Sequence, residues 1–542
     1  MSSRSGLVFL FFVFAFFSLS FSNAGHIYGV GSQELEITRI EYLLNGKVIP
    51  FSCEPISAAQ LSELLKKIPN ADERLKKSVK NELNSKGLKM FFKLSPMITS
   101  NNWDYTLPST YVDLEEAYRY YSLPSFIDFG GEINISDNFY GLIDVDLKRE
   151  FSNFYIYGNE SNVPHITSDL GIALNGNIPD VGFFGYQSEN IGFRIGRQKL
   201  KWGPGERGLL LSDASPYYDS IGFRFSTKGR VPKQLNYSFE YIGIDPHLTD
   251  EEFEIQSDST DAKSRIIYND RYKTLIAHRL DFLFFDSFRI GISELNLVGG
   301  KIPDLRCFSP LILFHNNYYF GFTNIMGGLD FSYSPFKNFE LYGEIAIDDI
   351  KLPSEQNNLP NAYGLLFGAQ YGNKLLSFYT TLTYEFVYTS DYIYNRNLPY
   401  LKFTNRFYNL SLHPRKESII DFPMGFYLGP DSISHYLKLR LINPPKFSST
   451  FSLEYLSKGP YTTFNGLVKL EDEKIRETNF KISTDLTFRE LFFKWLNLNL
   501  SANMQLIGNP VHFDNYSEYQ ESMKTTELLF DLRVGLNAEW SW

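Results

Sequence analysis

The chain has few cysteines, a negative net charge and no long apolar run beyond its N-terminus. These three features exclude several classes of function. Only Cys53 and Cys307 occur among 542 residues, with few histidines near them, so we expect no zinc site and no other cofactor. The formal charge of −10 gives the chain no general attraction for nucleic acid. Beyond the N-terminus, no run of about 20 apolar residues is present, which argues against a transmembrane helix.

The N-terminus has the pattern of a secretory signal peptide. Arg4 precedes an apolar run from Leu7 to Phe17, and the small residues Ser22 and Ala24 follow. We interpret residues 1–24 as the signal peptide. A short membrane anchor is the alternative, but the apolar run is shorter than a membrane span requires.

Aromatic residues, in contrast, are abundant. They make up 17% of the chain, with 49 Phe and 36 Tyr. Transmembrane β-barrels are rich in aromatic residues because these side chains form belts at both membrane interfaces, while apolar and polar residues alternate along each strand. The composition therefore favours a β-barrel, and a secreted all-β protein of similar length is the alternative.

The C-terminal segment favours the barrel. Every second residue is apolar over about eight positions, longer than most strands of soluble sandwiches, and the chain stops on an aromatic. Outer-membrane barrels typically end in this way. The apolar set is Leu528, Phe530, Leu532, Val534, Leu536, Ala538, Trp540 and Trp542.

The lengths of the connections predict the topology. From about Leu88 the residues alternate with a period of two, and tight connections alternate strictly with long ones, as in barrels with short periplasmic turns and longer outer loops. The tight connections are predicted at 136–138, 188–190, 228–233, 284–287, 334–338, 372–374, 443–447 and 489–494. The long ones are predicted at 152–179, 200–220, 244–273, 298–324, 349–361, 389–432, 457–477 and 507–526.

These connections imply an all-β fold in which residues 88–542 form a transmembrane antiparallel barrel. If Lys89–Leu94 supplies the first strand, the count is about 18 strands, with 16 possible, and both ends lie in the periplasm. We therefore expect a protein of the outer membrane, surrounded by its lipid and monomeric.

Residues 25–87 differ from the rest and predict a small periplasmic helical element. Ser57 is a good N-cap for a helix that Pro69 stops, and a second helix is expected from about Ala71 to Asn84. The element is either a plug or docking domain, or a cap over the lower rim of the barrel. Since Cys53 lies in this element and Cys307 in an outer loop, we expect no disulfide.

One long connection stands out because it is basic, aromatic and unable to continue a strand. Arg197, Lys199, Lys201 and Trp202 precede Gly203-Pro204-Gly205, and Pro216 closes the segment. The predicted topology places this loop on the outer side. Exposed loops on rigid scaffolds often carry function.

This segment resembles the central signature of the Wzi family of capsule-assembly outer-membrane proteins. The resemblance is carried by Gly196-Arg197-Gln198, Lys201–Gly205, Leu210-Leu211-Ser212 and Pro216, with weaker blocks at His278–Leu280, Tyr342–Glu344, Ile347–Asp349 and Leu428–Asp431. The blocks follow the order of the family along roughly residues 90–542. A departure occurs at Ser215, where family members often have an Arg.

The resemblance implies an eighteen-stranded barrel with a periplasmic helical element and a lectin-like function, in which capsular or other surface polysaccharide is bound and held at the cell surface. Aromatic faces suit sugar rings, and cations suit anionic sugars. Besides the loop-shaping Gly203, Pro204, Gly205 and Pro216, the candidate contacts in outer loops are Arg197, Lys199, Lys201, Trp202, Tyr217, Tyr218, Tyr318 and Tyr319. For each of these residues, packing under the loop or membership of the interface belt is the alternative.

Two other functions were weighed from the residues. A porin-like diffusion channel would need a polar lumen, which Glu132, Asn134, Asp144, Lys148, Glu240 and Glu344 could line, although long inward-folding loops argue that the lumen is plugged. An enzyme is not expected: the histidines are scattered, no Gly-x-Ser-x-Gly occurs, and Asp348 and Asp349 should point to opposite faces of a strand.

Overall fold

A computed structural model gives the fold of most of the chain. The residues it describes are 27–69, 71–84, 87–103, 112–135, 138–151, 161–166, 172–175, 179–188, 190–257, 260–261, 266–309, 322–350, 360–412, 415–463, 466–467, 476–509 and 526–542. The predicted signal peptide and the candidates Tyr318 and Tyr319 lie outside these residues. No helix in the described part of the chain is both long and apolar enough to cross a membrane.

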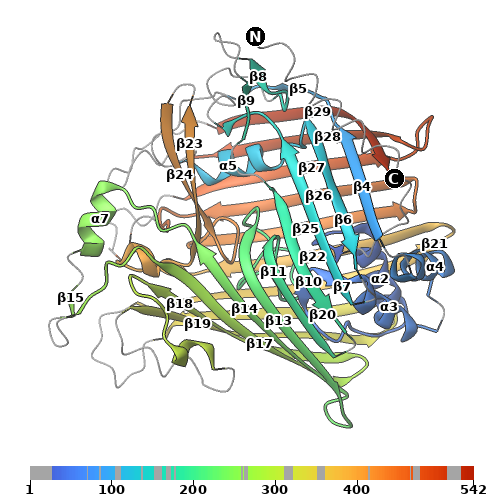
Figure 1. Ribbon diagram of the computed structural model, residues 1–542, viewed down its shortest axis with the longest axis horizontal. Coiled ribbons are helices and arrows are strands. Elements are labelled where there is room, and N and C mark those ends of the chain that lie inside the picture. Colours follow the sequence, from blue (N-terminus) through green and yellow to red (C-terminus); the bar gives the residue numbers. More distant parts are fainter. Residues whose placement is uncertain are drawn as a thin grey trace, which may run out of the picture.

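Antiparallel strands close into one barrel with eighteen strand positions, because β4 and β5 are two segments that both pair with β29 (Figure 1). In chain order the segments are β4 (Gly87–Leu94), β5 (Met97–Asn101), β6 (Ile127–Asn134), β7 (Phe139–Leu147), β10 (Val181–Gln187), β11 (Ile191–Gln198), β13 (Tyr218–Lys228), β14 (Gln234–Ile244), β17 (Lys273–Phe285), β18 (Phe288–Gly299), β19 (Thr323–Phe336), β20 (Phe339–Asp349), β21 (Ala362–Leu375), β22 (Phe378–Thr389), β25 (Ser432–Asn443), β26 (Phe447–Lys458), β27 (Glu477–Phe488), β28 (Leu496–Gly508) and β29 (Thr526–Ser541).

The predicted strand count and connections are confirmed. Every predicted tight connection joins two neighbouring strands, and the predicted first strand is β4, which pairs with the last strand through Phe92 and Trp540. Closure leaves no free sheet edge, which a barrel in lipid requires.

The two faces of the strands differ as the alternation predicts. On β11, the side chains of Ile191, Phe193 and Ile195 are exposed on the outside, whereas Arg194 is buried inside. On β29, Leu528, Phe530, Leu532, Val534 and Leu536 are exposed in the same way, and Asp531 and Arg533 are buried. Large apolar side chains on the outer face of a closed barrel are what the hydrocarbon of a membrane accepts.

The N-terminal element contains three helices, of which the sequence predicted two. Ser57 caps α3 (Ala58–Lys66) with a capping box to Gln60, and α4 (Glu73–Asn84) is the second predicted helix. The additional helix is α2 (Gln33–Leu44). These helices gather at one end of the barrel (Figure 1). The hairpin of β23 (Thr404–Leu412) and β24 (Arg415–Pro423) and helix α7 (Asp250–Ser257) lie toward the other end.

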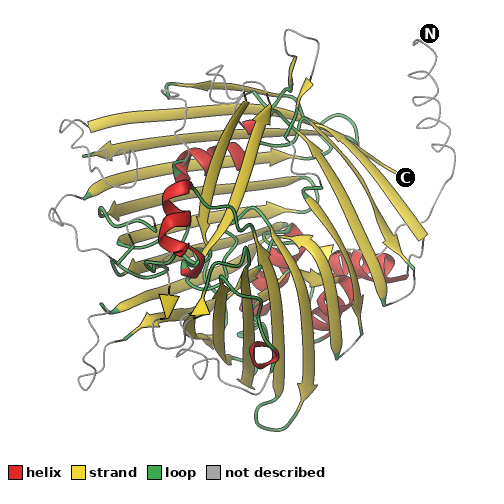
Figure 2. Cartoon of the chain, turned by 60° about the vertical axis from the view of Figure 1, so that its left-hand side comes forward, coloured by secondary structure: helices red, strands yellow, loops and turns green. Residues whose placement is uncertain are grey.

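Smaller elements fill the connections. Helix α5 (Leu114–Tyr121) and the hairpin of β23 (Thr404–Leu412) and β24 (Arg415–Pro423) pack together through aromatic side chains, among them Tyr120, Phe407 and Phe422. Figure 2 shows helices both among the outer connections and beside the strand ends. The other short elements are β1 (Ile27–Tyr28), β2 (Cys53–Glu54), β3 (Ile56–Ser57), β8 (His165–Ile166), β9 (Ile172–Ala173), β12 (Lys201–Trp202), α7 (Asp250–Ser257), β15 (Thr260–Asp261), β16 (Ile266–Ile267), η2 (Leu305–Phe308) and η4 (Pro399–Leu401).

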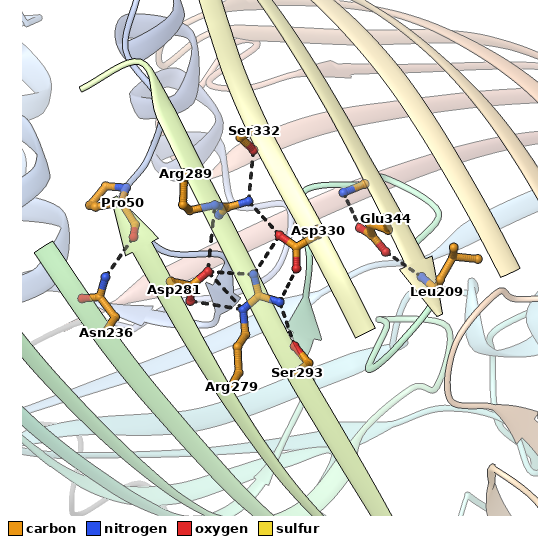
Figure 3. A network of polar contacts seen from close by, with 11 residues as sticks. Pro50, Leu209, Asn236, Arg279, Asp281, Arg289, Ser293, Asp330, Ser332 and Glu344 are labelled. Carbon is orange, nitrogen blue, oxygen red and sulfur yellow. Dashed lines mark hydrogen bonds and ion pairs between the residues drawn. The ribbon is translucent and has the colours of Figure 1, made fainter. Parts of the chain in front are cut away.

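A buried ion network ties three neighbouring strands together inside the barrel (Figure 3). Arg279 of β17 contacts Asp281 at 2.7 Å and Asp330 of β19 at 2.5 Å, and Arg289 of β18 contacts Asp330 at 3.2 Å. The side chains are almost completely buried. Because each charge has an opposite partner and further hydrogen bonds, the network satisfies groups that would otherwise be costly to bury.

Candidate functional site

The connection between β11 and β13, residues 199–217, folds into the barrel and meets the N-terminal element. Its strand β12 pairs antiparallel with β2, so that Trp202 lies opposite Cys53. The N–H of Gly203 also donates to the carbonyl of Ser52 at 3.0 Å. Trp202 is 0% exposed and shares a buried apolar cluster with Cys53. We call residues 199–217 the plug loop, because within the barrel they join the connection after β11 to the N-terminal element.

A buried carboxylate of the barrel wall holds the turn of the plug loop. Glu344 on β20 accepts the N–H groups of Gly205 at 2.8 Å and Leu209 at 2.9 Å (Figure 3). Gly203 has φ +95°, and a Cβ added there would lie 2.3 Å from a Glu344 oxygen. Glycine at this position therefore allows both the left-handed backbone and the close approach of the carboxylate.

A second wall carboxylate, Glu385 on β22, holds the next residues of the loop. It accepts the N–H groups of Glu206 at 2.6 Å and Arg207 at 3.1 Å. The side chains of these two residues form ion pairs in turn, Arg207 with Glu454 at 2.5 Å and Glu206 with Lys438. The wall thus supplies acceptors for backbone groups that have no strand partner, which is what burial of an irregular segment requires.

The hairpin of β23 and β24 covers the end of the plug loop. The amide of Asn405 on β23 donates to the hydroxyl of Ser215 at 2.7 Å and to the carbonyl of Tyr217 at 2.8 Å. Ser215 is completely buried. At the position where the sequence departs from the Wzi pattern, the small hydroxyl is therefore packed against the hairpin and bonded to it.

The predicted contact residues are divided between the interior and the surface. Trp202 and Tyr218 are 0% exposed, Lys201 is 5% and Tyr217 is 7% exposed, whereas Lys199 is exposed and Arg197 is half-buried. In this conformation, Trp202, Tyr218 and Lys201 have almost no surface with which to contact a polymer. Of the predicted loop-shaping residues, Gly203 and Gly205 contact Glu344, and Pro204 and Pro216 are half-buried in the loop.

Residues 179–409 match the family model of capsule assembly protein Wzi. We call residues 179–409 the Wzi-family region, because they match this family model. A search of curated protein sequences found no match.

One solved structure, Wzi of Escherichia coli, supports the same fold. Wzi of Escherichia coli, described as an outer-membrane protein involved in group 1 capsule assembly and as a carbohydrate-binding β-barrel, has 13% identity and a TM-score of 0.56, over 95% of this chain and 99% of that chain. OccAB4 of Acinetobacter baumannii has 9% identity and a TM-score of 0.41, over 85% and 100%. OccK5 (OpdH) of Pseudomonas aeruginosa has 7% identity and a TM-score of 0.38, over 84% and 98%.

The Wzi-family region contains the plug loop and much of the wall that holds it. It runs from just before β10 into β23 and includes Glu344, Glu385 and Asn405. With the apolar band on its outer face, the family match makes the chain an outer-membrane β-barrel.

An aromatic and basic group that the sequence reasoning largely missed lies on the outer connections of the Wzi-family region. The Arg197 guanidinium lies 4.0 Å from the centre of the Tyr217 ring, and Tyr217 contacts Phe407 with ring centres 4.6 Å apart. On the next residue of β23, Tyr408 stacks on the exposed His247, with ring centres 4.1 Å apart. We call Arg197, Tyr217, Phe407, Tyr408 and His247 the outer aromatic group.

No local signal in the sequence marked the part of this group that comes from β23. Tyr408 and Phe407 lie in a long connection without a motif, and only the pairing of β23 with β24 brings them to Tyr217 and His247. Arg197 is also held by Asp219, whose two oxygens accept from its Nε and Nη2 at 2.8 Å each.

Proposed function

We propose that this barrel binds a surface polysaccharide non-covalently on its outer connections and holds it at the cell, as part of capsule assembly. The observation that carries the proposal is the outer aromatic group, supported from below by the plug loop. Aromatic faces pack against the C–H surfaces of sugars, and the exposed Lys199 and His247 add polar groups for hydroxyl or acidic substituents. The carbohydrate-binding Wzi of Escherichia coli, with the same fold, supports the same proposal.

In this proposal the two halves of the predicted site have different tasks. Of the outer aromatic group, the exposed His247 and the half-buried Tyr408 and Arg197 contact the polymer. The buried Tyr217 and Phe407 support them. Trp202, Lys201 and Tyr218 keep the plug loop packed so that the outer connections have one shape. Preorganised loops bind better because less conformational entropy is lost on association. The plug also argues against a diffusion channel, since the polar lumen that a channel needs is crossed by residues 199–217.

A glycan-retention assay on a deletion strain tests this division. We expect His247→Ala with Tyr408→Ala to shift polysaccharide from the cell-bound to the shed fraction by at least several-fold, because interface aromatics carry much of the binding energy. The barrel of this variant should stay heat-resistant on gels. A matched control is Phe492→Ala, an exposed aromatic in the turn between β27 and β28 at the opposite end of the barrel. Retention equal to that of the native chain would reject the outer aromatic group as the binding surface.

A further inference from the structure

A small cavity with both polar and apolar lining lies between the N-terminal element and the barrel wall. One side is formed by Cys53 and by Lys67, which follows α3, and the other by strand residues that include Arg224 of β13 and Asn236 of β14. Asn190, from the tight turn between β10 and β11, also lines it, which places the cavity at the periplasmic end of the barrel. Its volume is about 30 Å³.

Arg224 lines this cavity and carries donors that have no partner in the described ranges of the chain. Its Nη1 donates to the carbonyl of Pro55 at 2.9 Å. Its Nε and Nη2 atoms are buried and have no acceptor among the residues that the structure describes. Unpaired buried N–H groups of a guanidinium are costly, and a group with two suitably placed oxygens would satisfy both.

The buried arginines of the barrel interior show what is unusual about Arg224. Arg194, which donates to the same Pro55 carbonyl, has Glu240 at 3.1 Å, and Arg279 has Asp281 and Asp330. Within the described part of the chain, no carboxylate forms an ion pair with Arg224. Arg194 and Arg224 therefore both donate to the Pro55 carbonyl, but among the described residues only Arg194 has a carboxylate partner, Glu240.

The remaining charges at the cavity do not supply the missing anion. Glu63 of α3 lines the cavity, but Lys228 lies 3.1 Å from its carboxylate and Lys67 lies 4.0 Å from it. Lys67 also donates to Gln234 at 2.7 Å. Arg224 and Lys67 thus outnumber the one lining carboxylate, and the cavity favours a negative ligand.

We propose that this cavity is a periplasmic oxyanion site, in which Arg224 holds a carboxylate or phosphate group through Nε and Nη2. The same edge of a guanidinium binds both oxygens of a carboxylate elsewhere in this chain, for example in Arg197 with Asp219 and in Arg406 with Asp421. The volume has room for about two water molecules, so it takes a single acidic group rather than a sugar ring. The site lies beneath β2 and is independent of the outer aromatic group.

Calorimetric titration of the full chain in detergent micelles tests the site with two probes, acetate as a small carboxylate and inorganic phosphate, at constant ionic strength. We expect saturable binding of one of them at a single site, and the probe that binds identifies the class of group. Arg224→Gln should weaken this binding at least about tenfold, because the bidentate contact is lost. Arg224→Lys should weaken it to an intermediate degree, since an ammonium keeps the charge without the planar pair of donors.

Arg230→Gln is the matched control, because it removes an arginine from the exposed tight turn between β13 and β14 and should leave binding unchanged. Heat-resistance on gels confirms that each variant is folded, and Arg224→Lys keeps the test valid if the Gln variant does not fold. Equal binding by the native chain and a folded Arg224 variant overturns the proposal. So does a native chain that binds neither probe at millimolar concentration.

Discussion

At the scale of the residue, Cys53 reports on the packing of the plug loop. Burial raises the pKa of its thiol to about 11, and the thiol is 1% exposed beside the pairing of β2 with β12. Only the thiolate is nucleophilic, so at pH 8 about one thiol in a thousand is reactive. In a Cys307→Ser background, we expect slow alkylation of Cys53 that accelerates about tenfold per pH unit up to about pH 11. An accessible cysteine would level off above its ordinary pKa of about 8.5. A plateau near that value would show that Cys53 is not buried.

Gly203, which directly follows β12, tests the same packing from the other strand of the β2–β12 pair. Gly203→Ala requires φ +95° and places a methyl group 2.3 Å from Glu344, so the plug loop must shift. The left-handed backbone alone costs about 1 kcal/mol. We expect alkylation of Cys53 to accelerate at least several-fold. Gly243→Ala is the matched control, since a Cβ there meets no atom within 4 Å. Equal alkylation rates in the Gly203→Ala and Gly243→Ala variants would show that the burial of Cys53 does not depend on the plug loop.

At the scale of the element, local patterns predicted the strands but not the pairing of distant segments. Apolar and polar residues alternate along β11 and β29 because one face of each strand meets lipid and the other meets the lumen. The length of each turn is also a local property, so both can be predicted from the sequence. The pairing of β12 with β2 joins residues about 150 positions apart and leaves no periodic signal. Helix α2 was missed for a related reason: Leu35, Ile37, Ile40, Tyr42 and Leu43 are all buried, so no single apolar stripe marks it.

The elements also explain why the site was predicted only in part. Trp202 and its neighbours were recognised as candidate contacts in a connection on the outer side, and Glu344 as a residue that could line a polar lumen, but nothing in the sequence joined the two. In the structure the loop satisfies its backbone N–H groups on that glutamate. The Tyr342–Glu344 block that resembles the Wzi family therefore has a structural basis: Glu344 holds the turn, and the Tyr342 hydroxyl donates to Glu385 at 2.7 Å.

At the scale of the whole molecule, the plug loop and the N-terminal element together decide whether the barrel conducts ions. Both Glu344 and Glu385 anchor the loop through pairs of N–H groups, one on each carboxylate oxygen. An amide keeps the shape of the carboxylate but has a single accepting oxygen, so one N–H of each pair would face an NH₂ donor. In planar bilayers we expect the native chain to show little steady conductance. Glu344→Gln with Glu385→Gln should raise the open probability or conductance several-fold, because the loop is released while the wall keeps its size.

Glu490→Gln, which removes an exposed carboxylate from the turn between β27 and β28, is the control for the change in charge and should behave as the native chain does. The comparison separates the two functions weighed from the sequence. A large steady conductance of the native barrel would mean that the plug loop leaves a path for solutes, and the porin-like function would then replace polysaccharide retention as the leading proposal. A closed native barrel that opens only in the double variant would instead mean that the loop seals the lumen and that the outer connections rest on a rigid support.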